Sequence, residues 1–367
     1  MNPNSNSHAA PRDAVDQIAQ AVLYEGYLLY PYRPSTKNRQ RWTFGGIYPR
    51  DWCAVQQSGD AAAIETQCLL LADSAAGLSV RVRFLQLVER QVGRLASPVA
   101  QLPAGETPDY QPVESLTVGG KLLHAWQEAI EREVDISQAS LAELVREPRS
   151  MSFSFGPACD VEPVPGEDGR IEAVIVRQQQ SLAGCVRASA ERLADGLYRV
   201  AVRVENDSPC PAAESLPREL AQLRSLVSAH AVLHTAGGRF ISLIDPLAEY
   251  QATASACRNQ GVWPVLVGDP GQADTMLAAP IILYDYPQIA PESPGDLYDG
   301  TEIDEILSLR IMTLSEEEKQ LARSVDERAR ALLERTDALD PQRLAALHGA
   351  RREMRSLAED DGHAPVR

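Results

Sequence analysis

The chain has few aromatic residues and lacks the short motifs that mark several common enzyme classes. Only 5% of its 367 residues are Phe, Trp or Tyr. It contains no G-x-x-x-x-G-K-[ST], no G-x-G-x-x-G and no G-x-S-x-G. These motifs build phosphate-binding loops, dinucleotide sites and nucleophile elbows. Their absence argues against standard nucleotide-binding enzymes and α/β-hydrolases.

The cysteine spacing and the apolar runs of the chain show no pattern typical of a metal site or a membrane span. No C-x-x-C pair occurs, so the sequence predicts free thiols in a reducing compartment, without a disulfide framework or zinc knuckle. The polar residues 1–13 have no apolar core of a signal peptide, and no run of about eighteen apolar residues exists. We therefore expect a cytoplasmic protein without a membrane span and without a bound cofactor. The six cysteines are Cys53, Cys68, Cys159, Cys185, Cys210 and Cys257.

Basic residues are outnumbered by acidic ones. The 35 Lys and Arg against 51 Asp and Glu give a net charge of -16. This balance argues against a nucleic-acid partner, because phosphate binding depends on clustered cations. The apolar content of 44% is enough for a real core.

Aromatic side chains, which are scarce elsewhere in the chain, are concentrated together with basic ones in the stretch 21–49. Seven aromatic residues fall within twenty-five positions there. Four cations lie among them, Arg33, Lys37, Arg39 and Arg41. Such a combination suits a small anion or stacked bases. Internal or partner-facing ion pairing is the alternative, and a segment elsewhere offers the opposite charge.

That segment is 292–305, in which carboxylates are dense. It contains Glu292, Asp296, Asp299, Glu302, Asp304 and Glu305. Carboxylates suit Mg²⁺ or Ca²⁺ or an acid–base pair, although the spacing is not that of an EF-hand. Helix capping and solvation explain them equally well. We expect the stretch 21–49 and the segment 280–305 to pack together as one binding surface. Its residues are Tyr30, Arg33, Lys37, Arg39, Arg41, Trp42, Asp285, Glu292, Asp296, Asp299 and Glu302.

Three further residues suggest metal or nucleophile chemistry. His230 and His234 lie four apart in a segment, 216–234, whose spacing predicts a helix, which would place them on one face. They lack the intervening Glu and the third ligand of a zincin helix. Cys257 is a candidate thiolate. The sequence leaves open whether any of the three binds metal, and we predict no metal site.

Hydrophobic periodicity predicts the architecture. Alternation at 78–92 places Val80, Val82 and Phe84 on one face of a strand. Further strands are predicted at 170–178, 180–192 and 197–206, with helices at 14–24, 216–234 and 247–259. Short turns between successive strands favour an antiparallel, sandwich-like sheet.

The fold class is therefore α+β, divided into five parts. A disordered leader at 1–12 precedes a β-rich body at 13–213 and a smaller α/β portion at 214–300. Capping boxes and a proline at a first helical position predict a helical tail at 301–357. Residues 358–367 are expected to be disordered.

Three stretches together resemble an uncharacterised family of bacterial proteins encoded in [NiFe]-hydrogenase gene clusters. They are YEGYLLYPYRPSTKNRQRWTFGGIYP, the segment 279–319 beginning APIILYDYPQIAPESPGDLYDG, and HAVLHTAGGRFISLIDP followed by CRNQGVWPVLVG. The likeness covers roughly the whole ordered chain and assigns no catalytic residues.

The resemblance implies an accessory or assembly protein, a maturation factor or scaffold, whose partner is a hydrogenase subunit or maturation protein. The chain lacks the C-x-x-C metal sites and the phosphate-binding loop of nickel-insertion and GTPase maturation factors, which favours a non-catalytic scaffold or chaperone over a metal carrier. The alternative is an enzyme that acts on a small anionic substrate between 33–44 and 285–305.

Overall fold

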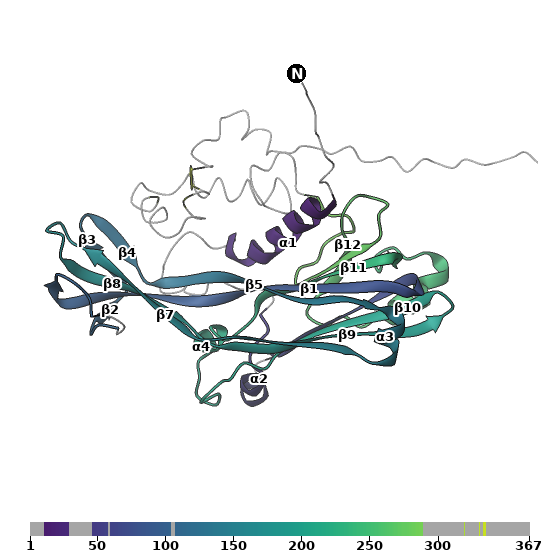
Figure 1. The fold of residues 1–367 in the computed structure, drawn as a ribbon, viewed down its shortest axis with the longest axis horizontal. Helices are drawn as coiled ribbons and strands as arrows, with labels where there is room; N and C mark the ends of the chain where they lie inside the picture. Colours follow the sequence, from purple (N-terminus) through teal and green to yellow (C-terminus); the bar gives the residue numbers. More distant parts are fainter. Residues whose placement is uncertain are drawn as a thin grey trace, which may run out of the picture.

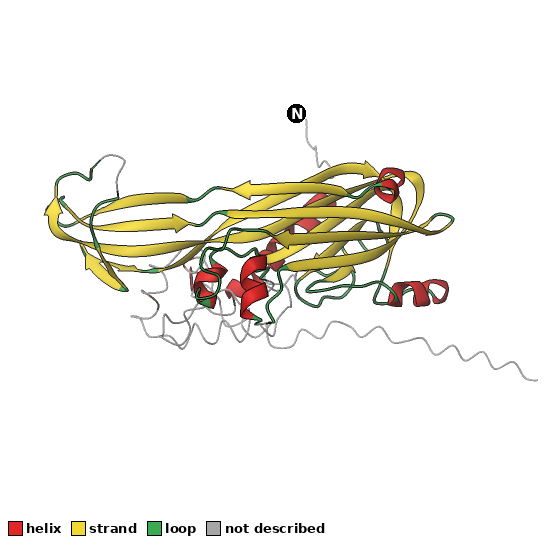
Figure 2. Cartoon of the chain, turned by 90° about the horizontal axis from the view of Figure 1, so that it is seen from below, coloured by secondary structure: helices red, strands yellow, loops and turns green. Residues whose placement is uncertain are grey.

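The protein is built on one very long strand. A computed structural model describes residues 11–28, 46–57, 59–103 and 107–288, with isolated positions at 319, 330, 333 and 334. The strand β1, Ala63–Val99, runs for 37 residues. It belongs to an eleven-stranded sheet, and five other described strands pair with it directly. The strands follow the long axis of an elongated molecule (Figures 1 and 2).

The remaining elements are short by comparison. The helices are α1 Pro11–Leu28, α2 Arg50–Gln56, α3 Leu141–Arg146, α4 Arg218–Gln222, the 3-10 helix η1 Ala248–Tyr250, and α5 Gln251–Ser255. The strands after β1 are β2 Gln111–Val113, β3 Ser115–Val118, β4 Lys121–His124, β5 Trp126–Ser140, β6 Arg149–Phe155, β7 Ala158–Pro165, β8 Ile171–Gln179, β9 Leu182–Ala194, β10 Leu197–Asn206, β11 Val227–Ile241, β12 Trp263–Leu266 and β13 Thr275–Ala279.

Strand β1 exchanges partners along its length. On one edge it pairs antiparallel with β10 over 63–71, with β5 over 77–90 and with β2 over 92–94. On the other edge it pairs with β11 over 69–85 and with β8 over 88–99. The register with β11 shifts between residues 72 and 77, which marks a bulge. Bulges bend a strand and increase its twist, so here the direction of β1 changes.

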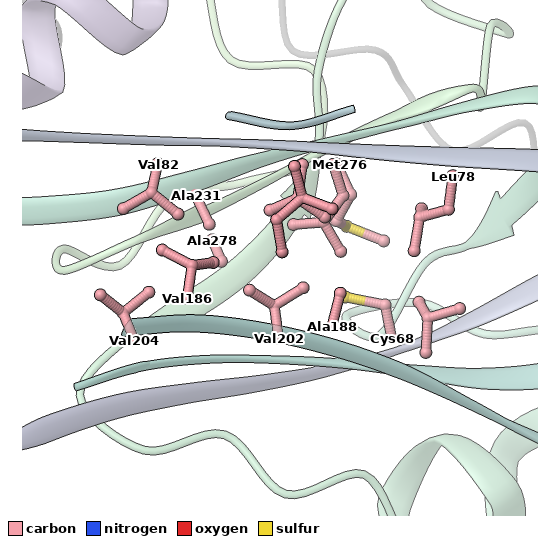
Figure 3. Packing of buried hydrophobic residues seen from close by; sticks show 14 of the residues in the cluster. Cys68, Leu78, Val82, Val186, Ala188, Val202, Val204, Ala231, Met276 and Ala278 are labelled. Carbon is pink, nitrogen blue, oxygen red and sulfur yellow. The ribbon is translucent and has the colours of Figure 1, made fainter. Parts of the chain in front are cut away.

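The bulge lets β1 contribute to two packed layers. Before it, Cys68 lies beside the β9 and β10 side chains, and after it Leu78 and Val82 lie with those of β11 and β13 (Figure 3). Both groups belong to one buried cluster, which is the core of the sandwich. Such alternating inward residues from two facing sheets are the usual core of a β-sandwich.

Beyond the sandwich, the last third of β1 forms an arm. Strands β8 and β7 extend it on one side, and β2 and the β3–β4 hairpin lie at its far end (Figure 1). A chain of ion pairs crosses the arm. Arg177 binds Glu128 and Glu162, each at 2.8 Å, and Glu128 also pairs with the buried Arg90 at 3.3 Å.

The antiparallel, β-rich architecture confirms the main part of the predicted fold. The strand predictions at 170–178, 180–192 and 197–206 correspond to β8, β9 and β10. Val80, Val82 and Phe84 are all buried in the core, as their alternation predicted. Helix α1 includes the predicted 14–24, although it begins at Pro11 and continues to Leu28.

The predicted helix at 216–234 is wrong. Only Arg218–Gln222 is helical, and the strand β11 begins at Val227. Strands β11, β12 and β13 belong to the same eleven-stranded sheet as β1 and β5–β10. The predicted leader up to residue 10, the helical tail at 301–357 and the segment 358–367 lie outside the described residues, apart from the four isolated positions.

The close approach of β9 to its neighbours gives a first test of the packing. A Cβ on Gly184 would lie 2.3 Å from the carbonyl oxygen of Glu205, whereas a Cβ on Gly156 would meet no atom within 4 Å. Gly184→Ala should therefore lower the free energy of unfolding by about 1–3 kcal/mol. Gly156→Ala should change it by less than about 0.5 kcal/mol. Urea denaturation measures both, and equal effects would contradict the described packing.

Candidate functional site

Of the eleven residues predicted to form a binding surface, the structure describes one, Asp285. The others lie outside the described residues: Tyr30, Arg33, Lys37, Arg39, Arg41, Trp42, Glu292, Asp296, Asp299 and Glu302. The predicted packing of 21–49 against 280–305 therefore stays a prediction.

Two aromatic side chains of the 21–49 stretch are described, and both have contacts within the chain. Tyr48 is buried, its ring stacks on Trp52 with centroids 5.1 Å apart, and the Arg218 guanidinium lies 4.9 Å from its ring centroid. The Tyr24 hydroxyl donates to Glu131 at 2.7 Å. These two rings stabilise the fold.

Asp285 anchors the segment that follows β13. Its carboxylate accepts hydrogen bonds from the Ser242 hydroxyl at 2.5 Å and from the backbone N–H of Leu266 at 2.8 Å. The Ser242 oxygen in turn accepts from the backbone N–H groups of Ile244 and Asp245. One carboxylate thus fixes residues 281–288 against the loop after β11 and against β12.

The two segments that Asp285 joins carry the most exposed large apolar side chains of the described residues. Tyr284 is 84% exposed, Ile282 77%, Leu247 65% and Ile244 51%. We call these four residues the apolar surface. Single exposed apolar residues are ordinary, but a concentration of them on adjoining segments is typical of an interaction site.

A second feature lies on the outer face of the sheet, where α1 covers β1, β5, β11 and β13 (Figure 1). The apolar face of α1, with Val15, Ile18 and Val22, packs on Val232 and Leu277. This burial confirms the predicted helical spacing of the N-terminal apolar residues.

A second face of α1 is polar and contacts charged side chains of the sheet. Asp16, Gln20 and Tyr24 are spaced by four residues and so share one face of the helix. Asp16 pairs with Arg81, and the Gln20 side chain accepts from Arg83 at 2.6 Å. Arg83 also pairs with Glu131 at 3.2 Å. The two faces together fix both the position and the rotation of α1.

An open pocket of about 490 Å³ lies beside the first turns of α1. Its floor crosses four neighbouring strands, since Ser137 comes from β5, Ser79 from β1, His234 from β11 and Thr275 from β13. The charged lining residues are Asp16, Arg81, Asp135 and Asp274. Three carboxylates against one guanidinium make the pocket acidic.

Hydrogen bonds hold His234 in one tautomer within this pocket. The Thr275 hydroxyl donates its proton to Asp274 at 2.8 Å. Its oxygen, 3.1 Å from Nδ1 of His234, must then accept a proton from that nitrogen. In the neutral imidazole, Nε2 consequently carries the free electron pair.

His230 is a buried core residue, and its predicted helical pairing with His234 is wrong. Both are on β11, whose period of two still places them on one face. His230 is fully buried, and its Nδ1 lies 2.9 Å from the Ser228 carbonyl. Burial, together with the nearby Arg83 and Arg81 charges, lowers the pKa of His230 to about 4, although the hydrogen bond to the Ser228 carbonyl acts in the opposite direction.

The remaining candidate, Cys257, has the character of a structural thiol. Its Sγ lies 3.7 Å from the Thr253 carbonyl oxygen, and burial raises its pKa, which favours the protonated form. All six cysteines are free thiols. Within the described ranges, no group of three or more His, Cys, Asp or Glu side chains is arranged to hold a metal ion.

Sequence reasoning missed the polar stripe of α1 and the pocket. The spacing of Asp16, Gln20 and Tyr24 was a usable signal for the stripe. The pocket had none, because its residues come from strands that are distant in sequence.

Comparison with known proteins adds no family assignment, since neither a protein-family model nor a curated protein matches the chain. Among the described helices, none is long and apolar enough to cross a membrane.

The depressed pKa of His230 predicts an acid-sensitive fold. Between about pH 6.5 and pH 4 an unfolded chain protonates this residue and the folded chain does not, so stability falls as the pH falls. His230→Gln keeps an N–H donor for Ser228 but does not titrate. The free energy of unfolding of this variant, taken relative to that of the wild type, should therefore be about 2 kcal/mol higher at pH 4.5 than at pH 7.5.

Chemical denaturation at the two pH values measures this gain. A difference between wild type and His230→Gln that is the same at both pH values would contradict the assignment.

The tautomer of His234 is open to direct measurement. The ring nitrogen and carbon shifts in NMR spectra at neutral pH should show protonation at Nδ1, which is the less common tautomer of free histidine. Thr275→Val removes the acceptor and should shift the ring toward the Nε2-protonated form. A wild-type His234 already protonated at Nε2 would contradict the hydrogen-bond chain.

Proposed function

We propose that the chain is a non-catalytic accessory or assembly protein of a [NiFe]-hydrogenase system and acts by binding a partner polypeptide. The observation that carries the binding role is the apolar surface, with Tyr284 84% and Ile282 77% exposed. A cytoplasmic location is part of the same proposal.

The apolar surface has the physical properties that a binding site needs. Burying one large apolar side chain contributes about 1.5–3 kcal/mol. The two bonds that Asp285 accepts hold the 281–288 segment in place before a partner arrives. Preorganisation of this kind reduces the entropy lost on binding.

The hydrogenase part of the proposal is supported by the resemblance. The segment 279–319, one of the stretches that carry the resemblance, contains Ile282, Tyr284 and Asp285. Ile282 and Tyr284 are among the most exposed apolar side chains of the described residues, and a partner shared with that family would explain the likeness at these positions. The partner is then a hydrogenase subunit or a maturation protein.

The alternative, an enzyme acting on a small anion between 33–44 and 285–305, has less support. Both carboxylate oxygens of Asp285, the one predicted binding residue that the structure describes, already accept hydrogen bonds from the chain. The acidic pocket beside α1 also disfavours an anionic ligand there, since like charges repel.

Affinity capture from cells that express hydrogenase tests the proposal. The double variant Ile282→Ser/Tyr284→Ser removes two exposed apolar groups and should reduce the recovery of a hydrogenase polypeptide at least about tenfold, which corresponds to about 1.4 kcal/mol. Val55→Ser, at a 47% exposed position on α2, is the matched control and should keep full recovery.

Two outcomes would contradict different parts of the proposal. Capture of no hydrogenase subunit or maturation protein by the wild type would remove the hydrogenase role. Equal capture by the wild type and the double variant would show that the partner does not use the apolar surface.

A further inference from the structure

The edges of the sheet are protected to different degrees. Unpaired strand edges invite pairing with other chains, and proteins usually block them with proline, charge or short length. Strand β12 has four residues and contains Pro264. The outer strand of the arm, β7, contains Asp160, Glu162, Pro163 and Pro165. Both edges are blocked in the usual ways.

Strand β6 ends the sheet order and has none of these features. Its seven residues, RSMSFSF, contain no proline and no acidic residue. It pairs with β9 from Arg149 to Phe155 without a register shift, and no described strand pairs with its other edge. Met151 is 41% exposed on this strand. A regular, weakly charged edge of this length is suited to strand addition.

The hydrogen bonds of β9 show which backbone groups of β6 point outward. Ala183, which lies opposite Ser154, donates its N–H to Ser208 and accepts from the N–H of Asp207, both at 3.0 Å. Its groups are therefore directed toward β10 and away from β6. Since antiparallel pairs alternate, the backbone groups of Ser154, Ser152 and Ser150 point away from β9.

The strand is also rigid. The rings of Phe153 and Phe155 pack on Phe84 with centroids 5.6 and 6.1 Å apart. The Arg132 guanidinium lies 4.4 Å from the ring centroid of Phe155. The edge is therefore fixed before any partner strand pairs with it, which lowers the entropic cost of pairing.

We propose that β6 pairs antiparallel with β6 of a second copy of this chain, forming a continuous sheet across a twofold axis at Ser152. In this register Ser150 lies opposite Ser154 of the other copy, and Met151 opposite Phe153. Hydroxyl residues face hydroxyl residues and apolar residues face apolar ones, and such cross-strand pairs stabilise a sheet. Arg149 lies opposite Phe155, a favourable cation–ring combination.

The charge of the chain opposes this association and gives it a diagnostic salt dependence. Each copy carries a net charge of -16, so two copies repel at long range. The strand itself contains a single charged residue, Arg149. Added salt screens the repulsion between copies and affects the strand pairing little, so it should strengthen the dimer.

Sedimentation equilibrium of the full chain, over a range of concentrations at low and high salt, tests the proposal. The wild type should form a dimer that tightens as salt increases. Ser152→Pro removes an outward N–H without removing a bond to β9, and should shift the equilibrium to monomer by at least about tenfold in the dissociation constant. Ser152→Ala, which keeps the N–H, should remain dimeric.

A second variant separates loss of pairing from loss of folding. Met151→Glu keeps every backbone group and places a carboxylate opposite Phe153 and diagonally beside the same carboxylate of the other copy, where like charges repel. It should therefore also be monomeric, with a wild-type circular dichroism spectrum. A wild type that is monomeric throughout would overturn the proposal. So would dimers that persist in both folded variants, or β6 amides that become protected only when a different polypeptide binds.

Discussion

The hydrogen-bonding requirement of β1 is the constraint on which the rest of the structure depends. Thirty-seven consecutive extended residues span up to about 120 Å, and buried backbone groups along such a length need partners on both edges. The chain meets this requirement with successive strands, β10 then β5 on one edge and β11 then β8 on the other. At the bulge between residues 72 and 77 the partner on one edge changes from β10 to β5, while β11 pairs with β1 on both sides of the bulge. The sandwich and the arm are therefore parts of one framework.

The outward-facing residues of β1 determine where α1 binds. Arg81 and Arg83 alternate with the core residues and meet the polar stripe of α1, while the apolar face of the helix covers β11 and β13. The same alternation forms the floor of the pocket. At the other end of β11, Asp285 holds the apolar surface against the sandwich. The proposed binding surface thus depends on the rigidity of the framework.

The sequence predicted the parts of the fold in which one face of a strand is buried and the other is exposed or polar. It failed at 216–234, where Ala229 and Leu233 face the core while His230 and Val232 lie under the layer that includes α1. A strand buried on both faces shows no alternation, and its apolar residues fit a helical stripe by chance. The pocket was unpredictable for another reason, because only the register between distant strands brings His234 and Ser79 together.

Hydrogen–deuterium exchange along β1 tests the central claim most directly. If the sandwich and the arm share one framework, peptides from 77–85 and from 88–94 should exchange slowly and at similar rates, because strands pair with both edges of β1 along these stretches. Rapid exchange of 88–94 beside a protected 77–85 would show that the arm opens independently, and would contradict the account of β1 as a single structural unit.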